Sequence, residues 1–278
     1  MLHQATDFAL HLSAIQASAQ ALLKAADALN DQQRPFVQHI ARISQNLLEQ
    51  LDGLPATEAA YLQVIPALGA AFRSPQESLI GYARMLLDHP QQFGSEQITE
   101  MQSAQLETLY THAIQLFQAT DAINQAAFRQ RQAQRQQPAA AFDLVTMLYQ
   151  QAPLYHYWLK PYPVQLVMNL DVILPPAWGR PYHVDGLIRH VLMTLAAELD
   201  YQGEMRLSAN SKQLGRVTVE LVCKDTQLSE EVLASLFQGN GRHLYGQHLH
   251  EDGGKIEVVR QHDGTHLLVH LQTRPHAL

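Results

Sequence analysis

Histidines next to carboxylates are the first residues of this chain whose type and spacing could do chemistry. His243, His248 and His250 are followed directly by Glu251 and Asp252. Imidazole and carboxylate ligands suit zinc or nickel, so one interpretation is a metal site. The spacing fits no strong metal motif, and the sequence holds 15 histidines, so we favour the other interpretation, a loop with exposed histidines. The sequence therefore predicts no metal and no cofactor.

Two further residue types could act as nucleophiles. His112 lies in a helical pattern, where an exposed imidazole could accept a phosphoryl group from the aspartyl phosphate of a partner. The alternative is a solvent-facing or interface histidine. Cys223, in an apolar stretch, is expected to be a small core residue, and a single cysteine forms no intramolecular disulfide. The sequence contains no P-loop and no serine, histidine and aspartate order typical of a hydrolase.

The region that would position His112 is helical. Apolar residues recur every three or four positions in the first 137 residues, which contain almost no strand pattern. This pattern predicts two helices separated near residues 30–35, followed by a second pair over about 57–88 and 95–135. A breaker segment with proline and glycine at residues 89–94 joins the second pair.

The last of these helices carries two apolar seams with a spacing of seven residues, which is typical of helices that pack along their length. The seams consist of Leu109, Leu116 and Ile123, and of Leu106, Ala113 and Thr120. Two helices cannot enclose a core alone. The second pair therefore packs either against the first pair of the same chain or against a second copy of the hairpin. We favour the second copy, which makes the protein a homodimer.

After Pro138 the period of the apolar residues changes. A short helix from about residue 142 precedes alternating strand patterns and one long apolar helix at about 181–201. The strands are expected at about 163–171, 203–211, 215–224, 255–261 and 265–273, with a further short helix at 229–237. The predicted fold class is α+β, with an all-α region followed by an α/β sandwich whose helices cover one face of a mixed sheet. The predicted domains are 1–55, 56–137 and 138–278.

Four segments, in order, carry a resemblance to a known family. They are residues 72–75 (FRSP) with 79–88 (LIGYARMLLD), 175–179 (PPAWG), 189–199 (RHVLMTLAAEL) and 253–258 (GGKIEV). Over about residues 64–273 the chain resembles the transmitter core of bacterial sensor histidine kinases. The resemblance implies a dimerising helical hairpin followed by an ATP-binding domain of the GHKL, or Bergerat, type.

The residues that perform the chemistry of this family are replaced here. The family's phosphorylated histidine matches Ala70, and the adjacent acidic residue matches Ala71. A methyl group cannot carry a phosphoryl group. The resemblance therefore implies a histidine kinase core that lacks its phosphoacceptor.

The nucleotide-binding motifs are degenerate as well. Thr194 and Glu198 stand where the family has the asparagine that holds magnesium, and a carboxylate there adds negative charge against a triphosphate. Asp225 is retained from the adenine-binding box, but Gln227 and Ser229 replace its glycines. The phosphate-binding lid is nearly absent, and its glycine box is matched only loosely by Gly239 and Gly241. The former nucleotide pocket is thus predicted to be vestigial.

These patterns predict a non-catalytic pseudo-histidine kinase that acts in two-component signalling by binding a partner, most simply a response-regulator receiver domain. The docking face that the resemblance implies comprises Phe72, Arg73, Gln76, Ile80 and Arg84. One alternative is a histidine phosphotransferase that uses the displaced His112. Another is a small-molecule sensor that uses the altered pocket near Asp225 and Glu198.

Composition narrows the classes of partner. The net charge is −7 with 46% hydrophobic and 16% charged residues, and neither half of the chain is basic, so a nucleic-acid partner is not expected. No apolar run approaches the roughly 18 residues that span a bilayer. The N-terminal residues show no basic stretch leading into a cleavable apolar segment. The sequence therefore predicts a cytoplasmic protein that does not bind a membrane.

Overall fold

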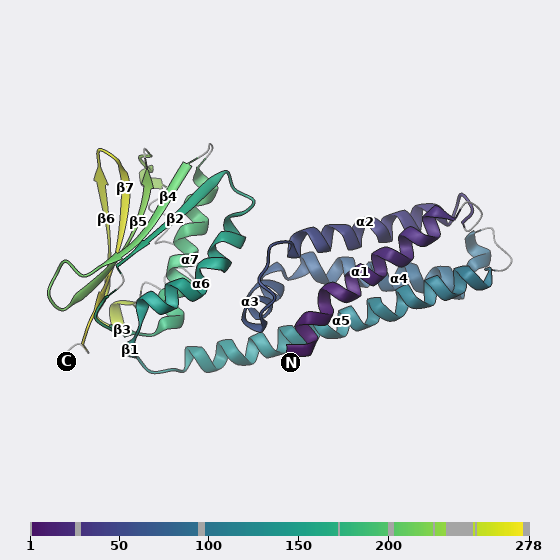
Figure 1. Cartoon of the computed structure of the whole chain (residues 1–278), viewed down its shortest axis with the longest axis horizontal. Coiled ribbons are helices and arrows are strands. Elements are labelled where there is room, and N and C mark those ends of the chain that lie inside the picture. The colour runs from purple at the N-terminus through teal and green to yellow at the C-terminus, as the bar shows by residue number, and fades with distance from the viewer. Residues whose placement is uncertain are drawn as a thin grey trace. The chain divides into compact units, whose positions relative to one another are not determined.

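The computed structural model describes residues 2–25, 29–93, 98–171, 173–199, 203–224, 226–231, 247 and 249–274. The chain forms two compact units, Met1–Arg131 and Gln132–Leu278. The first unit is a helical bundle and the second is an α/β sandwich (Figure 1). The predicted α+β class, with an all-α region before a sandwich, is confirmed. The division falls a few residues before the expected boundary at Pro138, because it lies inside the last helix of the bundle.

The bundle contains both predicted pairs of helices. Its elements are α1 (Leu2–Lys24), α2 (Arg34–Leu51), α3 (Glu58–Leu68), α4 (Ala70–Asp88), the short 3₁₀ helix η1 (Pro90–Phe93) and α5 (Glu100–Arg135). Pro35 lies in the first turn of α2, where a missing N–H costs nothing. Thr57 caps α3 by accepting a 3.3 Å hydrogen bond from the Ala60 N–H. The single helix expected over 57–88 is divided in two at Gly69, which has a φ of +46°.

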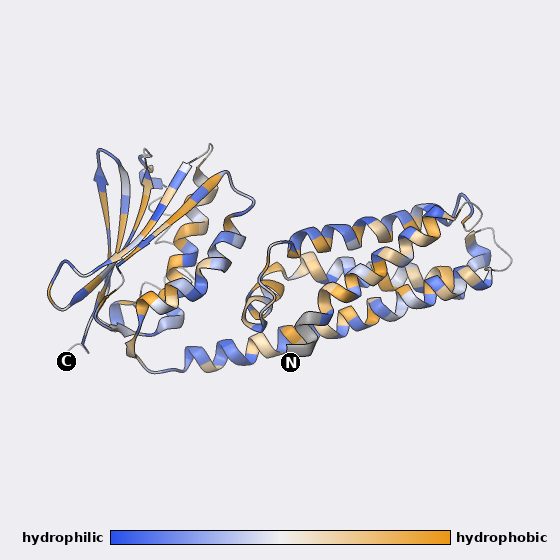
Figure 2. Cartoon of the chain, viewed as in Figure 1, coloured by the Kyte–Doolittle hydropathy of each residue, from blue (hydrophilic) through white to orange (hydrophobic). Residues whose placement is uncertain are grey.

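One hydrophobic core joins all the long helices of the bundle. Phe8, Leu12 and Ile15 of α1 and Val37, Ile40 and Leu47 of α2 are buried in the same cluster as the apolar residues of α4 and α5. Figure 2 shows orange, apolar segments along the helices of the bundle and the polar last turns of α5 in blue. Helices α1 and α2 therefore share a core with the hairpin and do not form a separate domain over 1–55.

The seams of α5 are covered within one chain. Leu106, Leu109, Ala113 and Leu116 are each at most 2% exposed, and Thr120 and Ile123 are also buried. The expectation that a second copy of the hairpin fills this face is wrong for these residues. The physical reason is that α1 and α2 present equivalent apolar stripes on a short tether, so they reach the seams before another molecule can.

The second unit contains every strand that the alternation predicted, to within about two residues at each end. Its elements are β1 (Ala140–Phe142), α6 (Leu144–Leu159), β2 (Val164–Leu170), β3 (Ala177–Gly179), α7 (Pro181–Glu198), β4 (Gly203–Asn210), β5 (Arg216–Lys224), β6 (Lys255–Gln261) and β7 (Gly264–Gln272). Asp143 caps α6 by accepting a 3.0 Å hydrogen bond from the Thr146 N–H. The three-residue strands β1 and β3 were not predicted. Of the helix expected at 229–237, only residues 229–231 lie among those described.

The sheet is mixed, as expected. Its order is β1-β3-β7-β5-β4-β2, with β6 also paired to β7, and the β2 and β4 pair is parallel while the others are antiparallel. Helices α6 and α7 lie on one face of the sheet (Figure 1). Between them lies a core that includes Leu148, Val191, Leu207, Val219 and Val269. The opposite face of the sheet carries both polar and apolar side chains, such as Glu220 and its ladder partner Leu268.

Among the described residues, no helix is both long enough and apolar enough to cross a membrane.

Candidate functional site

The positions that match the family's phosphoacceptor lie at the start of α4. Ala70 and Ala71 are the first two residues of this helix, and both are exposed. Gly69 begins the helix because its backbone, with φ +46° and ψ −117°, turns the chain in a way that a residue with a Cβ adopts only under strain. The structure thus presents this point of the bundle to solvent with two methyl groups and no nucleophile.

The predicted docking face needs correction at two of its five residues. Phe72 is completely buried, with its ring centroid 5.8 Å from that of Phe8, and Gln76 is 1% exposed. The two residues are four positions apart, so they lie on one side of α4. That side faces α1 and α5, since Phe72 contacts Phe8 and Gln76 bonds to Thr120. They therefore belong to the core of the bundle and not to its surface.

The remaining docking residues are accessible. Arg73 and Arg84 are exposed and form i,i+4 ion pairs with Glu77 and Asp88, each with 3.1 Å between the Nε and the carboxylate oxygen. The Asp88 partner raises the pKa of Arg84 through its hydrogen bond. Ile80 is half-buried beside them. Exposed ion pairs of this kind contribute little to folding, so both guanidinium groups are available to a partner.

Gly81 lies on the same exposed stripe of α4, between the two arginines. A Cβ built on Gly81 would meet no atom within 4 Å. The helix therefore offers a flat, open backbone between two cations, where the backbone of a partner can approach closely.

His112, the candidate phosphoacceptor, lies on α5 beside His11 of α1. Their Nδ1 atoms are 3.1 Å apart, and both side chains are half-buried. Burial lowers the pKa of His11, the nearby His112 lowers it further, and Asp7 raises it in part. One ring nitrogen of His112 is therefore engaged with another helix, a relationship that the sequence analysis did not anticipate.

The positions predicted to form a vestigial nucleotide pocket are only partly described. Thr194 lies half-buried on α7, and Gln227 donates a 2.6 Å hydrogen bond from its amide to the carbonyl of Gln261 at the end of β6. Gln227, which the resemblance matches to a glycine of the family, thus ties its loop to the sheet. Asp225, Gly239, Gly241 and the side chain of Glu198 lie outside the described residues.

The candidate metal ligands are likewise only partly described. His243 and His248 lie outside the described residues, while Glu251 and Asp252 form ion pairs with Arg180, with nitrogen–oxygen distances of 3.2 and 3.5 Å. Both carboxylates near His250 are thus occupied by a guanidinium group. Among the described residues, no group of three or more histidine, cysteine or acidic side chains is arranged to hold a metal ion.

Cys223 lies in β5 as expected of a core residue. It is 0% exposed, and burial raises the pKa of its thiol to about 12. A thiol that stays protonated at neutral pH is a poor nucleophile, so Cys223 packs as a small apolar side chain.

Two histidines that the sequence analysis overlooked lie on the outer face of the sheet. His266 and His270 alternate with apolar residues along β7 and are 5% and 6% exposed. The sequence feature that could have revealed them is their spacing of four residues in a strand, which places both side chains on one face of the sheet. Both ring nitrogens of His266 form hydrogen bonds with carboxylates. Nδ1 lies 2.8 Å from Glu220, and Nε2 lies 2.9 Å from Asp263. Burial alone lowers the pKa of His266, but these two hydrogen bonds outweigh it and raise the pKa overall.

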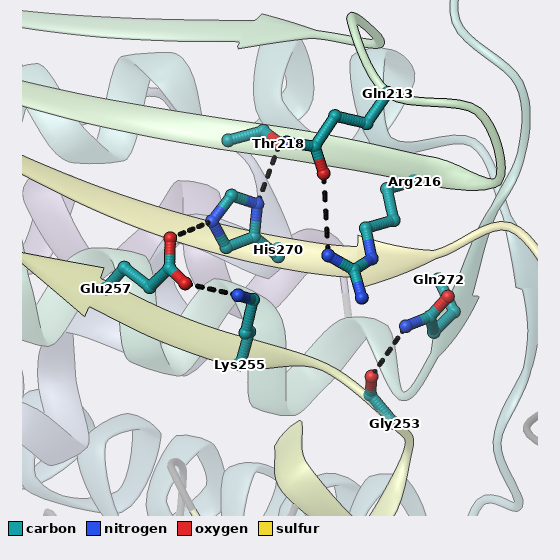
Figure 3. Close-up of polar contacts among 8 residues, drawn as sticks. All are labelled: Gln213, Arg216, Thr218, Gly253, Lys255, Glu257, His270 and Gln272. Carbon is teal, nitrogen blue, oxygen red and sulfur yellow. Dashed lines mark hydrogen bonds and ion pairs between the residues drawn. The ribbon is translucent and has the colours of Figure 1, made fainter.

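His270 connects three strands. Its Nδ1 lies 2.9 Å from the Thr218 hydroxyl of β5, and its Nε2 lies 3.0 Å from Glu257 of β6, which also pairs with Lys255 (Figure 3). A hydroxyl, an imidazole and a carboxylate in this order can activate a nucleophile. Here Thr218 and His270 are directly paired residues of the antiparallel ladder, and Lys255 already holds Glu257. We interpret the group as a cross-strand network that stabilises the sheet.

A buried polar pair joins the helices of the sandwich. The Tyr155 hydroxyl of α6 donates a 2.7 Å hydrogen bond to Asp185 of α7, and Asp185 is 9% exposed. Burial raises the pKa of Asp185, while Arg189 and the tyrosine hydroxyl lower it in part. The pair fixes the register of the two helices within an otherwise apolar core.

Several solved structures are similar to the chain at low identity. The mycobacterial sensor histidine kinase MprB shares 14% identity, with 50% of this chain and 100% of that chain covered, at a TM-score of 0.41. The Acinetobacter baumannii histidine kinase AdeS shares 15% identity, with 74% of this chain and 98% of that chain covered, at a TM-score of 0.39. The histidine kinase ThkA, solved in complex with the response regulator TrrA, shares 11% identity. The match covers 88% of this chain and 69% of that chain, at a TM-score of 0.42. At these scores the likeness does not assign the chain to a family.

No protein-family model matches the sequence, and no curated protein matches it either.

Proposed function

We propose that the chain is a non-catalytic signalling protein, a pseudo-histidine kinase that acts in two-component signal transduction by binding a receiver domain. The order of the resembling motifs supports this proposal, together with the hairpin and sandwich in which they lie. The single observation that carries it is the exposed stripe of α4. This stripe keeps two exposed arginines, each in an ion pair on its own helix, and an open glycine, but it has methyl groups at the positions of the phosphoacceptor and its acidic neighbour.

The chemistry of the stripe fits an acidic partner surface. Arg73 and Arg84 lie three helical turns apart on one side of α4, and Gly81 lies between them. Guanidinium groups bind carboxylates through charge-assisted hydrogen bonds, so the two arginines would complement carboxylates on the surface of a receiver domain. We define the docking face as Arg73, Ile80, Gly81 and Arg84.

We propose one receiver for each chain. The bundle is completed by α1 and α2, so the seams of α5 no longer require a homodimer.

The experiment is a titration of the full chain with a panel of receiver domains by isothermal calorimetry, each in its beryllofluoride-activated and free form. We expect one binding partner at a ratio of one to one, and a roughly tenfold loss of affinity for the Arg73→Ala/Arg84→Ala variant. The matched control is Arg42→Ala, an exposed arginine of α2 outside the docking face. Equal weakening by the control, or no binding to any receiver, would count against the proposal.

The non-catalytic part of the proposal has its own test. Titration with ATP and Mg²⁺, and incubation with labelled ATP, should give neither micromolar binding nor label on the protein. Label transferred from a phosphorylated receiver to the wild type but not to His112→Ala would instead establish the phosphotransferase alternative. A small-molecule ligand found by thermal shift would favour the sensor alternative.

A further inference from the structure

The contact between His11 and His112 links two helices that are far apart in the sequence. His11 lies on α1 and His112 on α5, and their neighbours Leu12 and Ala113 are buried in the core of the bundle. The two imidazoles lie at the edge of this core, where both are half-buried. Any force between the rings therefore acts directly on how firmly α1 covers α5.

The geometry is that of a hydrogen bond and not of a metal chelate. The Nδ1 atoms are 3.1 Å apart, and the ring centroids are 5.3 Å apart. The centroid separation nearly equals the nitrogen separation plus the two ring radii, so each nitrogen points along the line that joins the rings. Two lone pairs that face one another do not converge on a metal ion. One N–H must lie between the nitrogens for the contact to be favourable.

We propose that His11 and His112 form a pH-sensitive latch, which holds α1 on α5 while the pair carries at most one extra proton and loosens when both rings are protonated. With no extra proton or one, an N–H of one ring donates to the lone pair of the other. With two, both nitrogens carry hydrogen, so the bond is lost and two positive charges face each other. The burial and mutual repulsion that lower the pKa of His11 act in the same direction.

The other groups around His11 do not cancel this effect. Asp7, one turn earlier on α1, favours a protonated His11 but is a single carboxylate against two cations. From α2, the uncharged Gln45 bonds to Gln16 of α1, and the charged Arg34 bonds to the Leu23 carbonyl, about three helical turns from His11. From α3, Tyr61 lies against Phe8; its hydroxyl is neutral across this pH range, and burial raises its pKa further.

Loosening of α1 has a defined consequence. Phe8 and Leu12 would leave the cluster that covers Leu109 and Leu116, so the apolar seams of α5 would become accessible. The latch therefore makes exposure of the hairpin depend on pH in the range where histidine titrates. This inference does not depend on which partner the docking face binds.

The test is hydrogen exchange of the full chain, followed by mass spectrometry on peptides of α1. Protection, corrected for intrinsic exchange, is followed from about pH 7.5 down to about pH 5, because the second proton binds below the ordinary histidine pKa of about 6.5. In the wild type, α1 should lose roughly tenfold in protection at the lower pH, from the repulsion of two charges near the surface. His11→Gln and His112→Gln should remove most of this pH dependence. His89→Gln, at an exposed histidine of the same unit, should retain it.

A charge reversal keeps the proposal falsifiable if the glutamine variants are generally less stable. In His112→Glu, protonation of His11 creates an ion pair, so α1 should gain protection as the pH falls. The proposal is overturned if His112→Glu loses protection as the wild type does, or if His11→Gln keeps the full pH dependence.

Discussion

The amide nitrogen of Gln76 on α4 donates a 2.7 Å hydrogen bond to the hydroxyl of Thr120 on α5, inside the apolar core of the bundle. Thr120 in turn donates to the carbonyl of Leu116 at 2.9 Å. Gln76 Oε1 is buried and accepts no hydrogen bond from the described residues. The pair therefore links the two helices of the hairpin, and the buried Gln76 amide depends on Thr120 for its acceptor.

Thr120→Val should lower the free energy of unfolding by about 1–3 kcal/mol, because the Gln76 amide then loses its acceptor in the core. The double variant Gln76→Leu/Thr120→Val should recover most of that loss, since no buried donor remains unpaired. Urea unfolding followed by far-ultraviolet circular dichroism measures both. The control is Thr108→Val, an exposed threonine of α5 that also bonds back to its own helix. A double variant less stable than Thr120→Val would contradict this account.

Phe72→Ala should cost about 3–5 kcal/mol of unfolding free energy, because it removes a fully buried ring from the cluster around Phe8. Arg73→Ala, at the neighbouring exposed position, should change stability by no more than about 0.5 kcal/mol. Chemical unfolding of the two variants, side by side, distinguishes a core position from a surface position. If Phe72→Ala were as mild as Arg73→Ala, Phe72 would be available for docking after all.

The stability of the sandwich should depend on pH through His266. Its pKa is raised in the folded state, so the stabilisation from Glu220 and Asp263 is fully present below the unfolded value of 6.5. It is lost as the pH rises through the higher folded-state pKa. Unfolding midpoints measured across that window should fall in the wild type and stay flatter in His266→Gln. His156→Gln, at an exposed histidine of α6, should follow the wild type.

Gly69→Ala should destabilise the bundle by about 1–3 kcal/mol, since a residue with a Cβ must adopt a sparsely populated backbone conformation there. The cost arises from the backbone alone, because the nearest atom to the added Cβ would be the Pro66 carbonyl oxygen at 3.9 Å. Gly81→Ala, inside a regular helix with open space around it, should instead gain about 0.5–1 kcal/mol. Thermal unfolding reports both signs, and a destabilised Gly81→Ala would show that the surroundings of Gly81 are not open.

Gly81→Ala also separates stability from recognition. If the open glycine serves close approach of a partner, this variant should unfold at a higher temperature yet bind the receiver more weakly. Calorimetric titration of the same sample gives the second value. Unchanged affinity would remove Gly81 from the docking face and leave the two arginines.

Much of the sandwich could be predicted because its signals are local. Alternation along a strand and a Gly-containing turn such as residues 262–265 depend on neighbours within a few positions, so the strands from β2 to β7 were located to within about two residues, apart from β3. Strands β1 and β3 were missed because three residues are too few to show a period. The break at Gly69 was missed because the apolar period continues on both sides of it.

The candidate site was predictable in residue type but not in exposure. The replacement of the phosphoacceptor by Ala70 and Ala71 is read directly from the sequence. That Phe72 and Gln76 point into the bundle depends on which side of α4 the other helices occupy. The histidines of β7 could have been located on one face from their spacing, but their carboxylate partners come from other strands and from a turn.

The sequence by itself determined that α5 has two apolar seams and that other helices must cover them. It could not say whose helices these are, since a heptad pattern has the same form for a partner in the same chain and for a second copy. The tertiary structure decided this in favour of α1 and α2, because a short tether holds them at high effective concentration beside the seams. The same decision placed His11 against His112, a contact between residues that no local pattern connects.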